Sequence, residues 1–349
     1  MRIFLPIVTV LTLPVMGVAA VELDTLLDMD FEALNKVEIE TVYSASKMKQ
    51  HTTDAPSHVS VISSEEISRY NYRTLTEALA AQSGFYNTDD RNYNYIGVRG
   101  FSTPGDYSTK VLVLLDGQRT NDNLFSSPSV GTDFVLDMDL IDHIEIIRGP
   151  GSALYGTSAL FAVVNVISKS SKAFKNGEVA LTLGNYGTDK ECATFVHEFE
   201  DKSNILLSAT RYHSDGDSNL YYKEFDTPEN NNGYAKNIDN DDAYKLFMKY
   251  NSGNFTLESY YVKRDKEIPT APWETVFNKA VDSLDERGVI RLKYSKELDD
   301  TLRLSTSLAY NYYNFTGKYL YEDDGIVSSY DYNPTEWVDG TIDLHYKQK

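Results

Sequence analysis

The chain has 349 residues, enough for two domains, and its 52 aspartates and glutamates outnumber its 33 lysines and arginines. The formal charge of -19 argues against nucleic acid as a partner, because phosphate backbones attract basic proteins. A lone cysteine, Cys192, excludes an intramolecular disulfide, and the six histidines are too scattered for metal-ligand spacing or for a base beside a nucleophile. We therefore expect no metal and no cofactor, and an enzyme is the least favoured class of function.

The N-terminus has the order of a secretory signal. An apolar core from Ile3 to Val15 follows Arg2, and the small-residue run from Gly17 to Ala20 precedes an acidic stretch. This order predicts a signal peptide over residues 1–20 that is cut after Ala20. A membrane-anchoring helix is the alternative, but the apolar stretch is shorter than the ~20 residues that a bilayer span needs. We expect the mature chain to be exported.

An N-terminal extension follows over residues 21–56, and its second half contains a short alternating, β-prone segment. The segment consists of Val37, Glu38, Ile39, Glu40, Thr41, Val42 and Tyr43. An extended segment with free edges can pair with a partner's sheet through main-chain hydrogen bonds. The pattern therefore predicts either a handle for a partner protein or an ordinary first strand of the following domain.

Residues 57–172 alternate short strands with short helices, which is the pattern of a compact α+β domain. Val59–Ile62 predicts the first strand. Runs dense in Val, Ile and Leu predict four more, and such runs are typical of a buried sheet. These runs are Ile96–Arg99, Val111–Leu115, Ile144–Arg148 and Val163–Ile167.

Two capping boxes predict where the helices of this domain begin. Ser63 with Glu66 opens one helix, and Thr74 with Glu77 opens a second. We expect Gly84 to end the second helix in the left-handed conformation.

The stretch from Ile144 to Lys169, IEIIRGPGSALYGTSALFAVVNVISK, joins two β-branched runs through a glycine-rich crossing. It is not a phosphate-binding loop, because no Gly-Lys-Ser/Thr follows. Upstream lie GVRGF at Gly97–Phe101 and VLVLLDGQR at Val111–Arg119. In this order and spacing the three segments resemble the plug domain of TonB-dependent outer-membrane receptors.

The resemblance implies a location in the outer membrane of a Gram-negative cell and places residues 37–43 where these receptors carry their TonB box. It also implies that turn and crossing residues serve the plug fold: Gly100, Asp116, Gly117, Gly149, Pro150 and Gly156. Arg99 and Arg148 match the two plug arginines that, in the family, pair with barrel glutamates of later strands. We therefore expect both to lack these partners here, and the alternative is that they bond carbonyl groups within the plug.

Polar, aromatic and glycine-rich loops separate the predicted strands at residues 86–94, 102–109 and 120–132. In the family, the equivalent loops face the cell exterior and meet the ligand. Aromatic rings can stack on a flat chelate or macrocycle, and Arg119 can attract an anionic one. The alternative is that several of these side chains only pack the plug against the barrel wall. The candidate ligand contacts are Tyr93, Tyr95, Phe101, Tyr107, Arg119, Asn121 and Phe125.

From residue 173 to residue 349, hydrophobic side chains alternate with polar or small ones. In the segment 301–314, for example, Leu308 and Tyr310 share one face, and Ala309 and Asn311 share the other. This alternation is typical of an outer-membrane barrel, although a soluble sheet with one wet face would give the same pattern. The predicted export, the 26 tyrosines and the plug-like domain favour the membrane barrel.

The alternation predicts eight strands near 177–187, 190–199, 204–213, 243–250, 254–264, 287–296, 301–315 and 338–347. The turn at 251–254 is expected in the periplasm, and the links 214–242, 265–285 and 317–337 are expected as extracellular loops. Four aspartates in the first loop lack the spacing of a calcium loop, so a solvated acidic loop is the favoured interpretation. They are Asp226, Asp239, Asp241 and Asp242.

Receptors of this family close a barrel of about 22 strands around the plug, whereas an eight-stranded barrel has room only for side chains. The predicted fold class is therefore an α+β plug domain followed by antiparallel transmembrane strands of an incomplete β-barrel. We expect the chain to be the N-terminal part of a longer receptor.

The function implied by the resemblance is energy-coupled uptake of a scarce ligand, first a ferric siderophore or another iron chelate and second cobalamin. The expected partners are the periplasmic TonB protein, the small-molecule ligand and outer-membrane lipid. The alternatives are a passive outer-membrane barrel or adhesin, and a non-functional receptor fragment. The residues do not identify the ligand.

Overall fold

The computed structural model describes residues 41–42, 50–51, 58–102 and 105–346. The predicted signal peptide lies outside these residues, and so does most of the predicted handle at 37–43. Within the extension, β1 (Thr41–Val42) pairs antiparallel with β2 (Gln50–His51). None of the helices in the described part of the chain is long and apolar enough to cross a membrane.

A five-stranded sheet forms the centre of the first domain, and its strand order is β3-β8-β9-β6-β7. β6 and β9 run parallel, and the other neighbours run antiparallel. Apolar side chains cover both faces of this sheet, which explains why its strands lack polar alternation. The strands are β3 (His58–Ser63), β6 (Val111–Leu115), β7 (Gln118–Arg119), β8 (Ile141–Arg148) and β9 (Ala162–Ser168).

The run Ile96–Arg99 does not join this sheet, contrary to the prediction. It forms most of β5 (Asn94–Val98), which pairs with β4 (Phe85–Asp89) in a separate hairpin. Four residues connect the two strands, so local closure competes with pairing to the distant sheet. β4 also occupies the start of the predicted loop 86–94.

Both predicted helix starts are confirmed. The Ser63 hydroxyl accepts a hydrogen bond from the Glu66 backbone N–H at 3.1 Å, and the Thr74 hydroxyl accepts one from Glu77 at 3.3 Å. The predicted end of the second helix is wrong, because its C-cap is Ala81 and Gly84, with φ +83°, turns the chain into β4. The helices are α3 (Ser64–Tyr70), α4 (Leu75–Ala80), α5 (Ser152–Tyr155), η2 (Met138–Leu140) and η3 (Ser171–Ala173).

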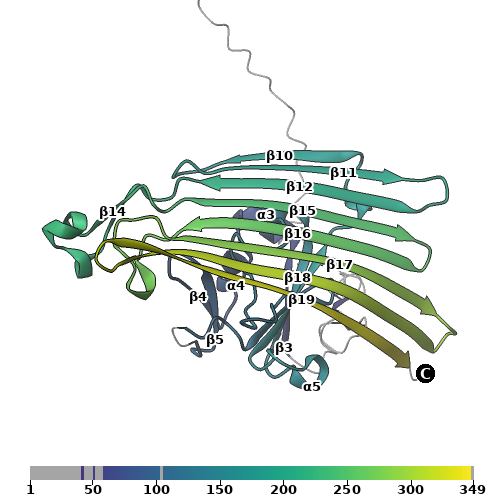
Figure 1. Cartoon of the computed structure of the whole chain (residues 1–349). Coiled ribbons are helices and arrows are strands. Elements are labelled where there is room, and N and C mark those ends of the chain that lie inside the picture. Colours follow the sequence, from purple (N-terminus) through teal and green to yellow (C-terminus); the bar gives the residue numbers. More distant parts are fainter. Residues whose placement is uncertain (1–40, 43–49, 52–57, 103–104, 347–349) are drawn as a thin grey trace, which may run out of the picture. The chain divides into compact units, whose positions relative to one another are not determined.

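An antiparallel sheet of eight strands follows, as predicted, and β10 and β19 are its two edges (Figure 1). A small hairpin of β13 (Asn219–Tyr221) and β14 (Tyr234–Lys236) projects between β12 and β15, with η4 (Lys223–Phe225) and η5 (Pro228–Gly233). The eight strands are β10 (Gly177–Leu183), β11 (Asp189–Glu198), β12 (Asn204–Ser214), β15 (Asp241–Ser252), β16 (Phe255–Glu267), β17 (Asp282–Glu297), β18 (Leu302–Glu322) and β19 (Ile326–Tyr346).

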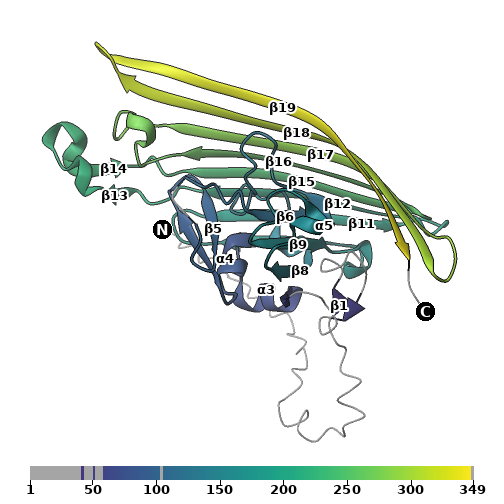
Figure 2. The same ribbon diagram turned by 90° about the horizontal axis from the view of Figure 1, so that it is seen from below.

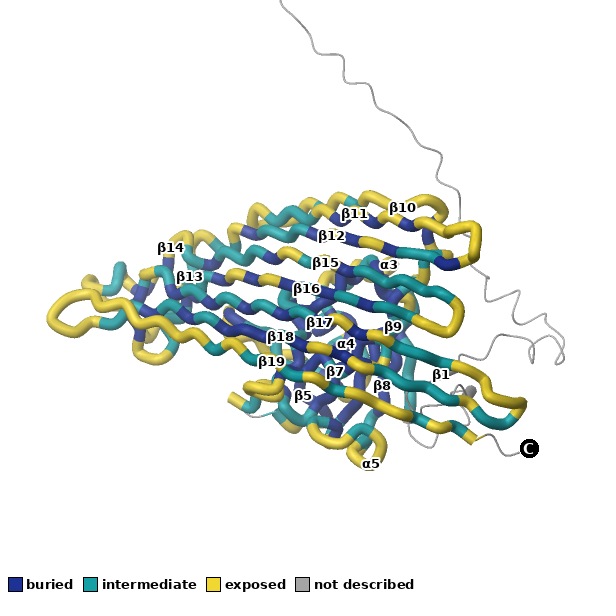
Figure 3. Tube along the Cα trace, turned by 45° about the vertical axis from the view of Figure 1, so that its right-hand side comes forward, coloured by how far each residue is buried: buried dark blue, intermediate teal, exposed yellow. Residues whose placement is uncertain are grey.

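The two faces of this sheet differ as the alternation predicts. On β18, Leu308 is 60% exposed and Tyr310 is 45% exposed, whereas Ala309 and Asn311 are buried. Bands of buried and exposed residues accordingly alternate along the strands in Figure 3. The exposed face is rich in Leu, Ile, Val and Tyr, as expected of a surface that meets lipid.

Two predicted loops are shorter than expected. β18 and β19 extend through the predicted loop 317–337 and leave only residues 323–325 between them. Pro334 lies in β19, where an edge strand tolerates a residue without an N–H. The predicted loop 265–285 shortens to 268–281 and contains η6 (Pro272–Glu274), whereas the turn between β15 and β16 lies within 251–254 as predicted.

Candidate functional site

The first domain lies against the inner face of the eight-stranded sheet (Figure 2). Apolar side chains from both, including Val164 of β9 and Phe247 of β15, belong to one buried cluster. Polar bonds add to it, because Lys190 of β11 contacts Asp137 at 3.0 Å and the Thr132 hydroxyl donates to Asp241 of β15 at 2.8 Å. The sheet is therefore one wall of the compartment that holds the domain.

A buried ionic group, which we name the Asp116 cluster, joins the turn between β6 and β7 to the sheet. It consists of Asp116, Ser168, Lys249, Glu258 and Arg291. The Asp116 carboxylate accepts from the Ser168 hydroxyl at 2.6 Å and from the Lys249 ammonium at 3.0 Å. Arg291 donates to the Asp116 carbonyl at 3.0 Å and pairs with Glu258.

The electrostatics of the cluster favour the charged form of Asp116. Burial alone would raise the pKa of its carboxyl, but Lys249, Lys293, the Ser168 hydroxyl and Arg291 outweigh burial and lower the pKa below its ordinary value of 3.8. The carboxylate therefore stays ionised at neutral pH and holds the turn against the sheet.

A cavity of 530 Å³ opens where the loops of the first domain meet the ends of the strands with long connections. We name it the aromatic pocket. Phe125 links its two sides, since its ring stacks on Tyr107 at 6.2 Å and meets Phe315 of β18 edge-on at 6.0 Å. The first domain lines it with Tyr93, Tyr95, Tyr107 and Phe125, and the sheet and its connections line it with Trp273, Tyr313, Phe315, Tyr319 and Tyr321.

Carboxylates hold the tyrosines of the pocket in place. The Tyr93 hydroxyl donates to Asp285 of β17 at 2.7 Å, and the Tyr313 hydroxyl donates to the other oxygen of Asp285 at 2.9 Å. Tyr95 donates to Asp90 at 2.8 Å. Burial, and next the charge of Asp285, raises the pKa of the Tyr93 phenol well above its usual range, so this ring stays neutral.

Four of the seven candidate ligand contacts, Tyr93, Tyr95, Tyr107 and Phe125, line the pocket, and the other three lie outside it. Arg119 donates to the Thr157 carbonyl at 2.7 Å, within the first domain. Asn121 is buried and accepts from the Val113 backbone N–H at 3.0 Å, which anchors β6. Phe101 is 63% exposed and stacks on Phe161 at 5.5 Å.

The residues that line the pocket on the side of the sheet were not predicted from the sequence. Tyr313, Phe315, Tyr319 and Tyr321 alternate on the face of β18 that should be polar in a barrel strand. Aromatic residues at four of five successive lumen-facing positions, interrupted only by Gly317, are the signal that could have identified them. Trp273, on the connection after β16, carried no such pattern.

Two glycines predicted to serve the plug fold lie where the chain turns or bends, and Arg99 and Arg148 lie at the ends of two different strands. Gly117 and Gly149 have φ of +82° and +125°, which fits their predicted role in the fold. Arg99 follows β5 and is exposed. Arg148 ends β8, and its guanidinium lies 5.7 Å from the ring centroid of Phe85.

The aspartates predicted as a solvated loop are mostly ion-paired instead. Asp239 contacts Lys266 at 2.6 Å, and Asp241 contacts Arg264 at 2.9 Å. Asp242 contacts the His213 ring at 2.9 Å, and Asp226 accepts from the Tyr221 hydroxyl at 2.9 Å. These carboxylates stabilise the strand ends, because each of the three pairs joins neighbouring strands or their flanks.

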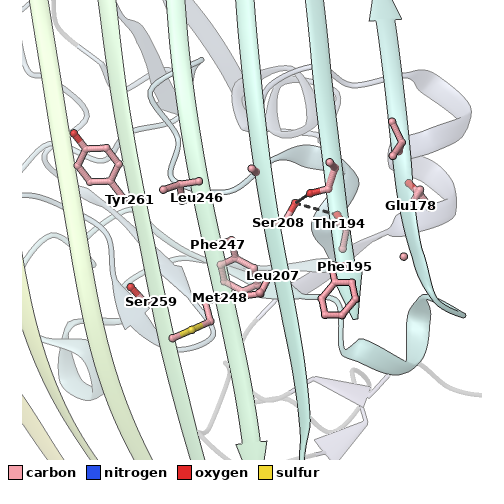
Figure 4. Close-up of a pocket in the computed structure, with 14 residues that line it drawn as sticks. Glu178, Thr194, Phe195, Leu207, Ser208, Leu246, Phe247, Met248, Ser259 and Tyr261 are labelled. Carbon is pink, nitrogen blue, oxygen red and sulfur yellow. Dashed lines mark hydrogen bonds between the residues drawn. The ribbon is translucent and has the colours of Figure 1, made fainter. Parts of the chain in front are cut away.

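A second hollow lies on strands β10, β11, β12, β15 and β16, and its lining differs from that of the aromatic pocket (Figure 4). Its lining is mostly apolar and includes Val179, Phe195, Leu207, Leu246 and Met248. Four of these five are exposed, and Met248 is partly buried. This hollow suits hydrocarbon chains of the bilayer rather than a polar ligand.

Three comparisons identify similar proteins. The family model of the TonB-dependent receptor plug domain matches residues 51–163. An iron-regulated outer membrane virulence protein of Vibrio cholerae is 32% identical over 152 residues, which are 42% of this chain and 22% of that protein. The vitamin B12 transporter BtuB of Vibrio vulnificus is 30% identical over 159 residues, which are 43% of this chain and 25% of the transporter.

The fold is similar to that of the pyoverdine outer membrane receptor FpvA from Pseudomonas aeruginosa PAO1, with a TM-score of 0.64 and 13% identity. The similarity covers 87% of this chain and 45% of the receptor, so the chain spans less than half the length of the proteins that it matches. The outer-membrane location and the predicted fold class are confirmed. This chain contains a TonB-dependent receptor plug domain, and the antiparallel sheet that follows it is similar in fold to solved outer-membrane receptors.

Proposed function

We propose that this protein captures a small ligand in the aromatic pocket and takes part in its energy-coupled uptake across the outer membrane. The observation that carries the proposal is the joint construction of the pocket, because plug loops and barrel strands both line the 530 Å³ cavity. A cavity of this size suits a small molecule rather than a protein surface. We propose an iron chelate as the first ligand class.

The coupling follows from the position of the plug. The plug is taken to exchange between two conformations. A bound ligand shifts this equilibrium toward the conformation that it binds more tightly, by a free energy equal to the difference between its two binding free energies. In this proposal, residues 37–43 then pair with the periplasmic TonB protein, which moves the plug and breaks contacts such as the Asp116 cluster. The role of residues 37–43 rests on the sequence pattern.

Cobalamin is the second candidate ligand. The similarity to a vitamin B12 transporter, at 30% identity, favours it specifically. An aromatic pocket can stack on a macrocycle as well as on a chelate, so binding of labelled cobalamin belongs in the same experiment.

Uptake by whole cells tests the proposal. Labelled ferric chelates and labelled cobalamin are offered to cells with and without an uncoupler of the proton-motive force. We expect one ligand to bind in both conditions and to accumulate only in energised cells. Accumulation without energy would instead support a passive barrel.

Matched variants connect uptake to the pocket. Tyr107→Ala removes a ring from the pocket wall and should weaken binding about tenfold, the loss expected of one aromatic contact. Tyr70→Ala removes an exposed tyrosine of α3 outside the pocket and should leave binding unchanged. Equal binding by wild type and Tyr107→Ala would contradict the assignment of the pocket.

A further inference from the structure

The walls of the aromatic pocket carry only one sign of charge. Among the residues that the structure describes, its lining includes five aspartates and no lysine, arginine or histidine. The aspartates are Asp90, Asp122, Asp133, Asp285 and Asp331. Three of them come from plug loops and two from β17 and β19, so carboxylates face the cavity from both sides.

These charges are hydrogen-bonded but not neutralised by cations that line the cavity. Asp122 accepts from the backbone N–H groups of Leu124 and Ser127, and Asp133 accepts from that of Gly131. Arg264 lies behind the Tyr93 ring, 5.7 Å from its centroid, and pairs with Asp241 outside the cavity. A ligand in the pocket therefore meets a negative potential.

Two further features of the wall suit a hydrogen-bond donor that carries positive charge. Nine aromatic rings line the cavity, and the faces of such rings attract an ammonium group. Asn92 also lines the pocket with only 6% of its surface exposed, and its side-chain oxygen accepts no hydrogen bond from the described residues. A buried acceptor without a donor is costly, so an N–H group of the ligand would stabilise it.

We propose that the pocket selects iron chelates that present a cationic ammonium group and discriminates against anionic ones. The inference rests on the proposed function and specifies its substrate class as cationic hydroxamate chelates. A ferric trihydroxamate with a pendant ammonium is cationic, whereas a ferric triscatecholate is anionic. Arg119, the one candidate contact suited to an anion, donates to carbonyl groups within the plug and does not line the cavity.

The test compares ligands that differ only in charge, with the protein in its native outer membrane. A linear ferric trihydroxamate with a terminal ammonium is measured beside the same chelate with that amine acetylated, and beside a ferric triscatecholate. We expect the cationic chelate to bind at least about tenfold tighter than the acetylated one and the triscatecholate to bind weakest.

Isosteric variants locate the effect. Asp133→Asn and Asp331→Asn should each weaken binding of the cationic chelate about tenfold and leave the acetylated chelate unchanged, which also reports that the pocket is folded. Asp300→Asn, at the exposed turn between β17 and β18, removes the same charge outside the pocket and should change neither.

Equal binding of the two hydroxamates, or tightest binding of the triscatecholate, would overturn the charge selectivity and leave the receptor function intact. Absence of binding by any chelate and by cobalamin would overturn the receptor function, and the selectivity with it.

Discussion

At the scale of single residues, Asp116 connects a tight turn of the plug to the barrel. Replacing it by Asn keeps the shape of the side chain but removes the charge that Lys249 contacts at 3.0 Å. A hydrogen bond to a charged group contributes about 1.5–3 kcal/mol. We expect Asp116→Asn to lower the free energy that holds the plug against the sheet by this amount. The measurement is the urea concentration at the midpoint of protease cleavage of the plug, which should fall. An unchanged midpoint would show that the Asp116 cluster does not hold the plug.

The pH dependence of this contact has a definite sign. The folded pKa of Asp116 lies below its ordinary value of 3.8, so its stabilising contribution is fully present above that pH. The contribution is lost as the pH falls through the folded pKa. The difference in urea midpoint between wild type and Asp116→Asn should therefore be constant near neutral pH and shrink in strong acid. A difference that grows on acidification would contradict the assignment.

Gly117 and Gly149 test whether positive φ is what the plug turns require. No atom lies within 4 Å of a Cβ built on either residue, so alanine would meet conformational strain without a clash. We expect Gly117→Ala and Gly149→Ala to destabilise the plug by about 1 kcal/mol or more and to leave ligand affinity unchanged. Gly288→Ala is the control, because its φ lies outside the left-handed region and its Cβ would make an ordinary contact at 3.6 Å. Lost affinity with unchanged plug melting would reverse this interpretation.

At the scale of elements, the cap of α4 offers a matched comparison. Thr74 accepts a hydrogen bond from Glu77, whereas Thr227, also an N-cap threonine, makes no capping bond with its side chain. Thr74→Ala should cost about 1 kcal/mol of plug stability, and Thr227→Ala should cost little. Both are measured by thermal unfolding of the protein, in which Thr74 lies in the plug and Thr227 in the connection between β12 and β15. Equal losses of stability in the two variants would show that the capping hydrogen bond is not the cause of the loss in Thr74→Ala.

The most accurately predicted strand is one that is buried on both faces, because its residues are then apolar at every position. β6 was predicted at its observed bounds, because a sheet covered on both faces needs apolar residues at every position. The β4–β5 hairpin was not predicted, because Asn87 and Asp89 of β4 have low strand propensity and pairing across a short connection stabilises them. The length of β18 was underestimated for a related reason, since pairing with β19 extends it through residues typical of a loop.

At the scale of the whole molecule, only part of the site could be predicted from the sequence. Tyr93 and Phe125 were predicted as ligand contacts because the family resemblance implies that their loops meet the ligand, and both line the pocket. The opposite wall is built by Phe315 and Trp273, which follow them by more than 140 positions and come near only when the plug lies against the sheet. The sign of charge in the cavity was also hidden, because it depends on which aspartates converge and on where Arg119 points.

The most direct test of energy-coupled capture separates ligand binding from ligand uptake in the same cells. Ile39→Pro removes an N–H from the predicted TonB handle and restricts the residue before it, whereas Ile39→Val keeps the N–H and serves as the control. Binding and energised uptake of the labelled ligand are measured for both variants and for wild type. We expect all three proteins to bind the ligand equally and only Ile39→Pro to lose uptake. Uptake by Ile39→Pro at the wild-type rate would contradict the account.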